Sequence, residues 1–185
     1  MSARPAGLAL LAALLLGSAA AEPVDPGFRA RVEGLLGAYR AVTVAEWQAL
    51  GPEAAPLLEE VARDARALPT RRARALAALG VLRPEAAAPI VRELASDGTV
   101  PVPLRAAALD VAPGVLGADA PGFLAPFLRD RQARVRRHSA EALVASGAAG
   151  CRVLAAEART RSASDPVVGA VAACGSRDGG SSPDR

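Results

Sequence analysis

The sequence predicts an all-α fold in which short helices stack in pairs, and the first supporting observation is a repeated pattern. The pattern returns every 33 residues, and its clearest marker is the series Asp64, Asp97 and Asp130. Apolar pairs return at the same interval, as Leu57/Leu58, Ile90/Val91 and Phe123/Leu124. Such an interval is typical of helical repeat proteins, in which each unit buries its apolar face against the next.

Composition supplies two further observations. Apolar residues make up 51% of the chain, with Ala prominent among them, whereas aromatic residues make up only 3%. Small side chains allow close helix packing, and Ala has the highest helix propensity. A sandwich or barrel would need runs that alternate Val, Ile, Thr and aromatic residues with polar ones, and the sequence contains no such run.

The charged residues restrict the class of partner. All 22 basic residues are Arg, and the formal net charge is +3. Arg can indicate phosphate or carboxylate recognition, although codon usage in a GC-rich genome also explains a chain without Lys. A nucleic-acid-binding protein would show a basic stripe with aromatic residues for base stacking, which Trp47, Tyr39 and three Phe do not supply. We therefore expect no nucleic-acid partner.

Residues 1–21 are interpreted as a secretory signal peptide. Arg4 gives the positive start, Leu8 to Leu16 the apolar core, and Ala19-Ala20-Ala21 a cleavage site. The core is shorter than the roughly 20 residues that span a bilayer. We predict cleavage before Glu22, no membrane span in the mature chain, and export to the periplasm or outside the cell; an uncleaved anchor is the alternative.

Residues 22–45 are predicted to form a lead-in and an N-terminal helical cap. One helical face is defined by Phe28, Val32, Leu35, Leu36 and Tyr39. Thr43 and Glu46 form a capping-box pattern that opens a short helix through Leu50. An end unit of this kind covers the apolar face that inner repeats bury against each other.

Residues 46–174 are predicted to contain the helix pairs, followed by a disordered tail over residues 175–185. The expected helices span residues 53–68, 71–82, 84–96, 103–116, 120–128, 132–146, 149–161 and 166–174. We expect Leu68 in the core, Thr70 as an N-cap, and Pro113 to kink its helix or end it early. Asp165 followed by Pro166 is a clear helix start.

The repeats resemble a known family. Asp130-Arg-Gln-Ala-Arg-Val-Arg136, with Ala140 and Ala142-Leu143, resembles the HEAT repeat, and the segment from Asp165 to Ala173 looks like the same motif one unit later. Arg72, Arg105, Arg136 and Gly169 occupy equivalent positions. Gly169 departs from the family's Arg, and Pro101, Pro103 and Pro113 make the third pair irregular.

This resemblance implies a short right-handed α-solenoid of about four HEAT-like (armadillo-type) helix pairs with an N-terminal helical cap. The family serves mostly as protein-binding scaffolds, and units of about 31–33 residues are close to the compact repeats of phycobilin lyases. Stacked Asp and Arg residues usually tie the turns together, by helix capping and by pairing between repeats. We therefore expect a structural ladder of Asp64, Asp97, Asp130, Arg72, Arg105 and Arg136.

The sequence predicts no catalytic residue, no metal site and no cofactor. His138 is the only His, and Ser139 follows it. Adjacent residues on a helix do not face each other, so the two do not form the nucleophile–base pair that catalysis needs. One His and two Cys are too few ligands for a structural zinc site unless carboxylates complete it.

Cys151 and Cys174 are expected to form a disulfide. Export places the chain in an oxidising compartment, and an even number of cysteines suits pairing. Cys151 starts one predicted helix and Cys174 ends the next, so the two lie side by side in an antiparallel helix pair. The alternative is two buried thiols. A redox role would favour a Cys-x-x-Cys motif, and the sequence has none.

Two groups of charged residues are candidate partner-binding sites. The densest basic run contains Arg129, Arg131, Arg134, Arg137 and His138; its alternative role is a solvated helix face that pairs with Asp130 and Glu141. The second helices of the pairs carry Glu60, Arg63, Arg92 and Glu93. In HEAT-like proteins those helices usually line the concave surface.

Three functions follow from these expectations. The leading hypothesis is an exported, non-catalytic adaptor that presents a curved surface to a protein partner. The second is an accessory protein similar to phycobilin lyases that positions a small ligand. The third is a purely structural envelope component. A polar concave face of mixed charge favours the first, and an apolar groove with converging polar groups favours the second.

Overall fold

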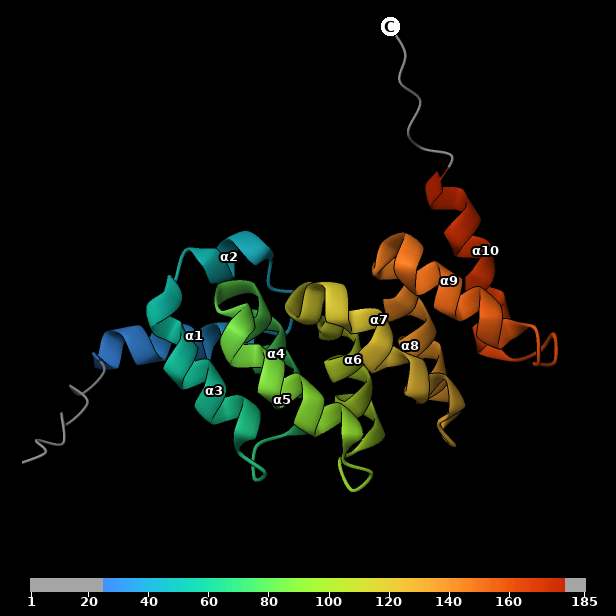
Figure 1. Cartoon of the computed structure of the whole chain (residues 1–185). Coiled ribbons are helices and arrows are strands. Elements are labelled where there is room, and N and C mark those ends of the chain that lie inside the picture. The colour runs from blue at the N-terminus through green and yellow to red at the C-terminus, as the bar shows by residue number, and fades with distance from the viewer. Residues whose placement is uncertain (1–24, 179–185) are drawn as a thin grey trace, which may run out of the picture.

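The structure is a computed structural model that describes residues 25–178. This range is all-helical and contains no strand (Figure 1), which confirms the predicted fold class. The predicted signal peptide and residues 179–185 of the predicted tail lie outside it. The elements, with η marking 3₁₀ turns, are α1 (Pro26–Gly37), α2 (Val44–Gln48), η1 (Pro52–Ala54), α3 (Ala55–Arg63), α4 (Pro69–Leu82), α5 (Pro84–Ser96), α6 (Val102–Leu116), η2 (Gly117–Asp119), α7 (Ala120–Leu124), η3 (Ala125–Arg129), α8 (Ala133–Ala145), α9 (Gly147–Ala158) and α10 (Pro166–Asp178).

The helices are arranged in two rows. One row contains α4, α6, α8 and α10, each in contact with the next, and the other contains α3, α5, α7 and α9, in which α3 contacts α5 and α7 contacts α9. From α3 to α10, each helix also packs against its neighbour in the chain. The described chain is extended along one direction, with α1 at one end and α10 at the other (Figure 1).

The repeated apolar positions form the core between the rows. Leu58, Val91 and Leu124, spaced by 33 residues, are all fully buried. Burying such a side chain contributes roughly 1.5–3 kcal/mol. Ala75 and Ala108 show the same spacing and are also fully buried, where α4 and α6 pack together. Buried core positions therefore recur at the 33-residue interval found in the sequence.

Several predicted helix boundaries were wrong, because short turns replace helical segments. α3 ends at Arg63, and the Asp64 carboxylate accepts the Arg66 N–H at 2.8 Å to form a turn. Leu68 lies in this connection and is 70% exposed, not buried. Pro69 begins α4, since its fixed φ suits the first helical position, so Thr70 lies inside the helix and is not its N-cap.

Proline acts differently at two sites. α6 continues past Pro113 to Leu116, and Gly117 caps it with a φ of 53°. The missing N–H of Pro113 removes only one hydrogen bond near the helix end. The expected helix over residues 120–128 instead divides into α7 and η3 at Pro126. Pro126 has no N–H to donate to the carbonyl four residues earlier, so the chain continues as the 3₁₀ turn η3 instead of an α-helix.

Both ends of the described chain also differ from expectation. α1 ends at Gly37, so Tyr39 is fully exposed and does not join the apolar face of the cap. Thr43 and Glu46 do form the predicted capping box. α10 continues to Asp178, so residues 175–178 are helical and the predicted tail is wrong for them.

Within residues 25–178, one stretch is long and apolar enough to cross a membrane by length and composition. It runs from Val102 to Arg129, with a mean hydropathy of 1.3 over its most apolar window. In the structure this stretch comprises α6, η2, α7 and η3, and α6 packs against α4, α5 and α8. Of its most apolar window, 33% is buried in the structure, and the lack of a span in the mature chain stays a prediction.

Candidate functional site

The aspartates of the predicted ladder shape the turns between helices. Each one accepts the backbone N–H of the residue two positions later, in an Asx turn. The four bonds are Asp64 to Arg66, Asp97 to Thr99, and Asp130 to Gln132, each at 2.8 Å, and Asp165 to Val167 at 2.9 Å. Asp165 therefore continues this series, although it was not part of the predicted ladder.

The ladder arginines connect these turns to the helices. Arg72 Nε donates to the Ala62 carbonyl at 3.0 Å, and Arg105 Nε donates to the Ala95 carbonyl at 3.1 Å. Both side chains are buried. Arg105 also pairs with Asp130, one repeat later, at 2.7 Å. Among the described residues Arg72 has no corresponding carboxylate partner.

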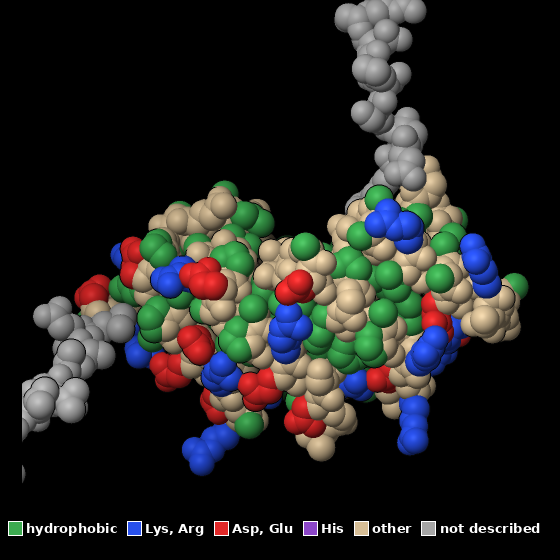
Figure 2. All heavy atoms as spheres, viewed as in Figure 1, with side chains coloured by type: hydrophobic (Ala, Val, Ile, Leu, Met, Phe, Trp, Pro, Cys, Tyr) green, Lys and Arg blue, Asp and Glu red, His purple; other side chains and the backbone are tan. Residues whose placement is uncertain are grey.

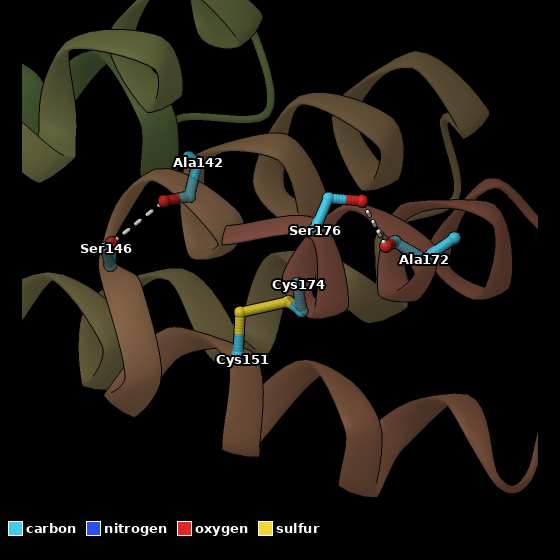
Figure 3. Close-up of a disulfide and its surroundings, with 6 residues drawn as sticks. All are labelled: Ala142, Ser146, Cys151, Ala172, Cys174 and Ser176. Carbon is cyan, nitrogen blue, oxygen red and sulfur yellow. Dashed lines mark hydrogen bonds between the residues drawn. A yellow bond between two sulfur atoms is a disulfide. The ribbon is translucent and has the colours of Figure 1, made fainter. Parts of the chain in front are cut away.

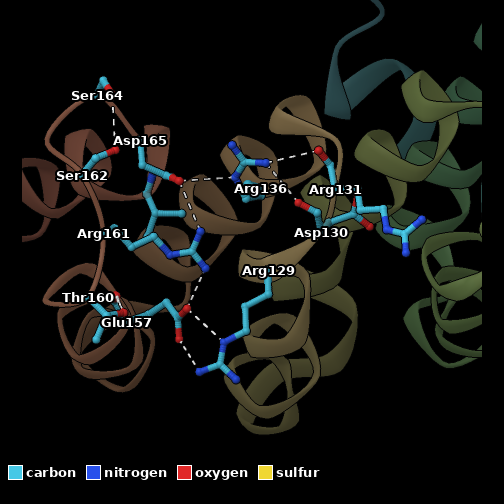
Figure 4. Close-up of polar contacts among 11 residues, drawn as sticks. Arg129, Asp130, Arg131, Arg136, Glu157, Thr160, Arg161, Ser162, Ser164 and Asp165 are labelled. Atoms are coloured by element: carbon cyan, nitrogen blue, oxygen red, sulfur yellow. Dashed lines mark hydrogen bonds and ion pairs between the residues drawn. The ribbon is translucent and has the colours of Figure 1, made fainter.

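Arg136 continues the ladder from the next repeat. It donates to the Asp130 carbonyl at 3.0 Å, and its Nε lies 3.5 Å from Asp165 Oδ2 (Figure 4). Burial raises the pKa of Asp130, but the Gln132 N–H and the Arg105 guanidinium together lower it below its ordinary value. Arg72, Arg105, Asp130 and Arg136 are thus engaged within the protein, whereas Asp64 and Asp97 are exposed.

A second set of charges lies on the row formed by α3, α5, α7 and α9. We call it the paired-charge row, and it joins successive elements. Its members are Arg29–Glu60 at 3.9 Å, Arg63–Glu93 at 2.8 Å, Arg92–Asp119 at 3.7 Å and Arg129–Glu157 at 2.8 Å. Figure 2 shows acidic and basic side chains interspersed on this face. Of the four candidates predicted on the second helices, the structure pairs Arg63 with Glu93, whereas Glu60 and Arg92 pair with Arg29 and Asp119.

Arg129 belongs to this row rather than to the basic run beside it in sequence. It donates two hydrogen bonds to Glu157, at 3.0 and 2.8 Å (Figure 4). Arg161 donates to the same carboxylate at 2.6 Å and to Asp165 at 3.2 Å. Arg129 and Arg161 together lower the pKa of Glu157 to about 2. Glu157 lies within the expected helix over residues 149–161, but the sequence did not predict this pairing, because Arg129 and Glu157 are 28 residues apart.

The remaining basic residues form what we call the arginine face, which consists of Arg131, Arg134 and Arg137. All three are exposed, Arg131 in the turn before α8 and Arg134 and Arg137 on α8. The side chains of Arg131 and Arg134 make no hydrogen bond or ion pair with any described residue. Arg137 lies 3.8 Å from Glu141, and both of those side chains are 56% exposed. An exposed pair at this distance contributes little, so this face can accept carboxylates from outside.

His138 differs from the arginines beside it. Its side chain is only 16% exposed, and Nδ1 lies 2.7 Å from Asp110 on α6. Ser139 is engaged separately, because its hydroxyl donates to the buried Leu124 carbonyl at 2.8 Å. His138 therefore links α8 to α6 and does not belong to the arginine face. The lack of catalysis stays a prediction.

Asp110, His138 and Glu141 are the described residues that could together hold a metal ion, with ligand atoms within 4.8 Å of one another. Nδ1 of His138 already contacts the Asp110 carboxylate at 2.7 Å, and Nε2 is buried without a partner among the described residues. The absence of a metal site stays a prediction.

Cys151 and Cys174 are joined as a disulfide in the structure, as predicted (Figure 3). Their Cα atoms lie 5.8 Å apart, with Cys151 near the start of α9 and Cys174 in α10. The bond links the last two helices of the described chain.

No protein-family model, curated protein or solved structure matches this chain. The resemblance to HEAT repeats therefore rests on the residues of the chain itself.

Proposed function

We propose that this protein is an exported, non-catalytic scaffold that binds a protein partner. Its architecture would be a short right-handed α-solenoid of about four HEAT-like helix pairs with an N-terminal helical cap. Two features support this architecture: the two rows of helices, and the identical bonds of Arg72 and Arg105 to carbonyls ten residues earlier. Because each repeat contacts mainly its neighbours, such a stack holds a surface in a fixed shape.

The observation that carries the function is the arginine face. Elsewhere on the surface, the paired-charge row satisfies its arginines internally. Arg131 lies in the turn before α8 and Arg134 lies on α8, and neither side chain makes a hydrogen bond or ion pair with a described residue. A guanidinium presents donors that match a carboxylate in a bidentate manner, and unpaired charges steer oppositely charged partners. We infer an acidic protein partner.

Export is proposed on two grounds. Residues 1–21 have the pattern of a secretory signal peptide, and the cysteine pair suits an oxidising compartment. The destination would be the periplasm or the exterior.

The proposal is tested by capture from envelope extracts with the tagged chain that begins at Glu22. We expect a specific protein to bind the unmodified chain and to be lost with the double variant Arg131→Glu/Arg134→Glu. Arg66→Glu is the matched control, since Arg66 is exposed in a turn, and it should retain the partner. Recovery of a tightly bound pigment or cofactor instead would contradict the scaffold.

One observation favours the second candidate, a ligand-positioning protein similar to phycobilin lyases. A largely apolar groove of 420 Å³, bordered by Arg137 and Glu141, lies between α8 and α10. Its volume falls within the range of small-molecule sites, roughly 300–1,000 Å³. Such sites, however, usually enclose most of the ligand, and exposed Gly169 and Ala173 leave this groove open to solvent.

A further inference from the structure

The groove between α8 and α10 has a basic margin and an apolar floor. It is lined by Arg137, Glu141, Val144, Pro166, Gly169, Ala170 and Ala173. A second hollow of 280 Å³ adjoins it, sharing Arg137 and Pro166 and adding Ala133 and Arg134. Both lie on the row of α4, α6, α8 and α10, so the groove is separate from the paired-charge row.

Gly169 helps to create the open space. It occupies the position that Arg72, Arg105 and Arg136 hold in the other repeats. A Cβ built at Gly169 meets no heavy atom within 4 Å, so packing does not require glycine here. Glycine inside a helix costs roughly 0.5–1 kcal/mol relative to Ala. The chain therefore carries a helix-weakening residue at the floor of a groove, where a larger side chain would fit.

The charge at the margin indicates what the groove can take. Arg134 and Arg137 project from α8, and the sole acidic residue of the lining is Glu141, which pairs only loosely with Arg137. The margin thus carries a net positive charge above apolar residues. A complementary ligand combines carboxylates with apolar side chains at short spacing.

We propose that this groove docks an acidic amphipathic segment of the partner protein, with apolar side chains on Gly169, Ala170 and Ala173 and carboxylates on Arg134 and Arg137. This inference rests on the proposed scaffold function and names where and how the partner binds. The open side favours a peptide, which covers the groove as it binds. A second copy of this chain would bring its own arginines against the same margin.

The experiment is selection of random 12-residue peptides, displayed on phage, against the full chain from Glu22. We expect enriched peptides to combine Asp or Glu with Leu, Ile, Val or Phe. Synthetic peptides from the enriched set, measured by fluorescence anisotropy, should bind Gly169→Leu and Arg134→Glu at least tenfold more weakly than the unmodified chain. Raising the salt concentration should weaken binding as well.

Two matched variants control for folding. Gly34 is also an exposed helical glycine without neighbours within 4 Å, so Gly34→Leu should leave binding unchanged, and so should Arg66→Glu. Circular dichroism and thermal unfolding confirm that each variant is folded. Because Leu has a better helix propensity than Gly, Gly169→Leu should unfold at a temperature no lower than the unmodified chain.

Four outcomes would overturn the proposal. Enriched peptides that bind Gly169→Leu normally would place binding elsewhere and leave the scaffold function standing. A failure to enrich any peptide rejects the groove, while the envelope capture judges the scaffold separately. Groove-dependent binding to phosphatidylglycerol vesicles would assign a lipid instead. Self-association in sedimentation that Gly169→Leu abolishes would assign a second copy.

Discussion

At the scale of single residues, the buried arginines show what sequence spacing can and cannot predict. The interval between Arg72 and Arg105 indicated equivalent roles, and both do bond a carbonyl ten residues earlier. The acceptors, Ala62 and Ala95, carry no sequence signal, because any residue supplies a carbonyl. The predicted Asp partner is present for Arg105 but not, among the described residues, for Arg72.

Replacing Arg105 with Met should lower the free energy of unfolding by about 2–4 kcal/mol, since it leaves the Ala95 carbonyl and the Asp130 carboxylate without a strong donor. Arg72→Met should cost less, about 1–2 kcal/mol, because only a carbonyl loses its partner. Arg92→Met is the exposed control and should cost less than about 1 kcal/mol. Urea unfolding measures all three, and equal losses for Arg105 and Arg92 would contradict the ladder.

The Glu157 carboxylate makes stability depend on pH. Its pKa lies at about 2 in the folded protein, against an ordinary value of 4.5, because Arg129 and Arg161 donate to it. A lowered folded pKa stabilises the fold above the unfolded value, and that contribution is lost as the pH falls towards about 2. Glu157→Gln should therefore show a smaller decrease in unfolding free energy between pH 5 and pH 2. Parallel pH profiles for the two proteins would contradict this assignment.

At the scale of elements, the α-helices were predictable, whereas the 3₁₀ turns and several helix ends were not. Pro84–Ser96 coincides with the prediction because its limits are set locally, by Pro84 at the start and Asp97 after the end. Leu68 was misplaced because its apolar character suggested burial, whereas the Asp64 turn had already ended the helix. Apolar spacing predicts a helix, but a competing turn decides where it stops.

Reduction of the disulfide should loosen α10 more than any earlier helix. The bond closes a segment of 23 residues in sequence separation, worth at most about 3 kcal/mol on the chain-entropy estimate. In the double variant Cys151→Ser/Cys174→Ser, amide hydrogen exchange should accelerate in α9 and α10 and stay unchanged in α3 and α4. Equal acceleration across the described helices would show that the bond supports the whole fold.

At the scale of the whole molecule, the candidate surfaces depend on contacts that the sequence does not encode locally. The sequence placed Arg129 and Arg131 in one basic run, although they are two residues apart in η3 and the following turn and join different surfaces. The α8–α10 groove was not predicted at all. Its lining comes from two helices, and the groove exists because small side chains leave space between them. A small residue such as Gly169 indicates a groove only when the residues around it in space are known.

The proposed solenoid makes a prediction about how far a destabilising substitution acts along the chain. If each repeat is held mainly by its neighbours, Leu154→Ala in α9 should destabilise α8, α9 and α10 and leave α3 and α4 protected from hydrogen exchange. Leu58→Ala in α3 is the mirror control, since both leucines are fully buried, and it should affect α3, α4 and α5 instead. Each substitution removes about 2–5 kcal/mol of local stability. A single cooperative core would respond uniformly to either change, and uniform exchange in both variants would reject the solenoid.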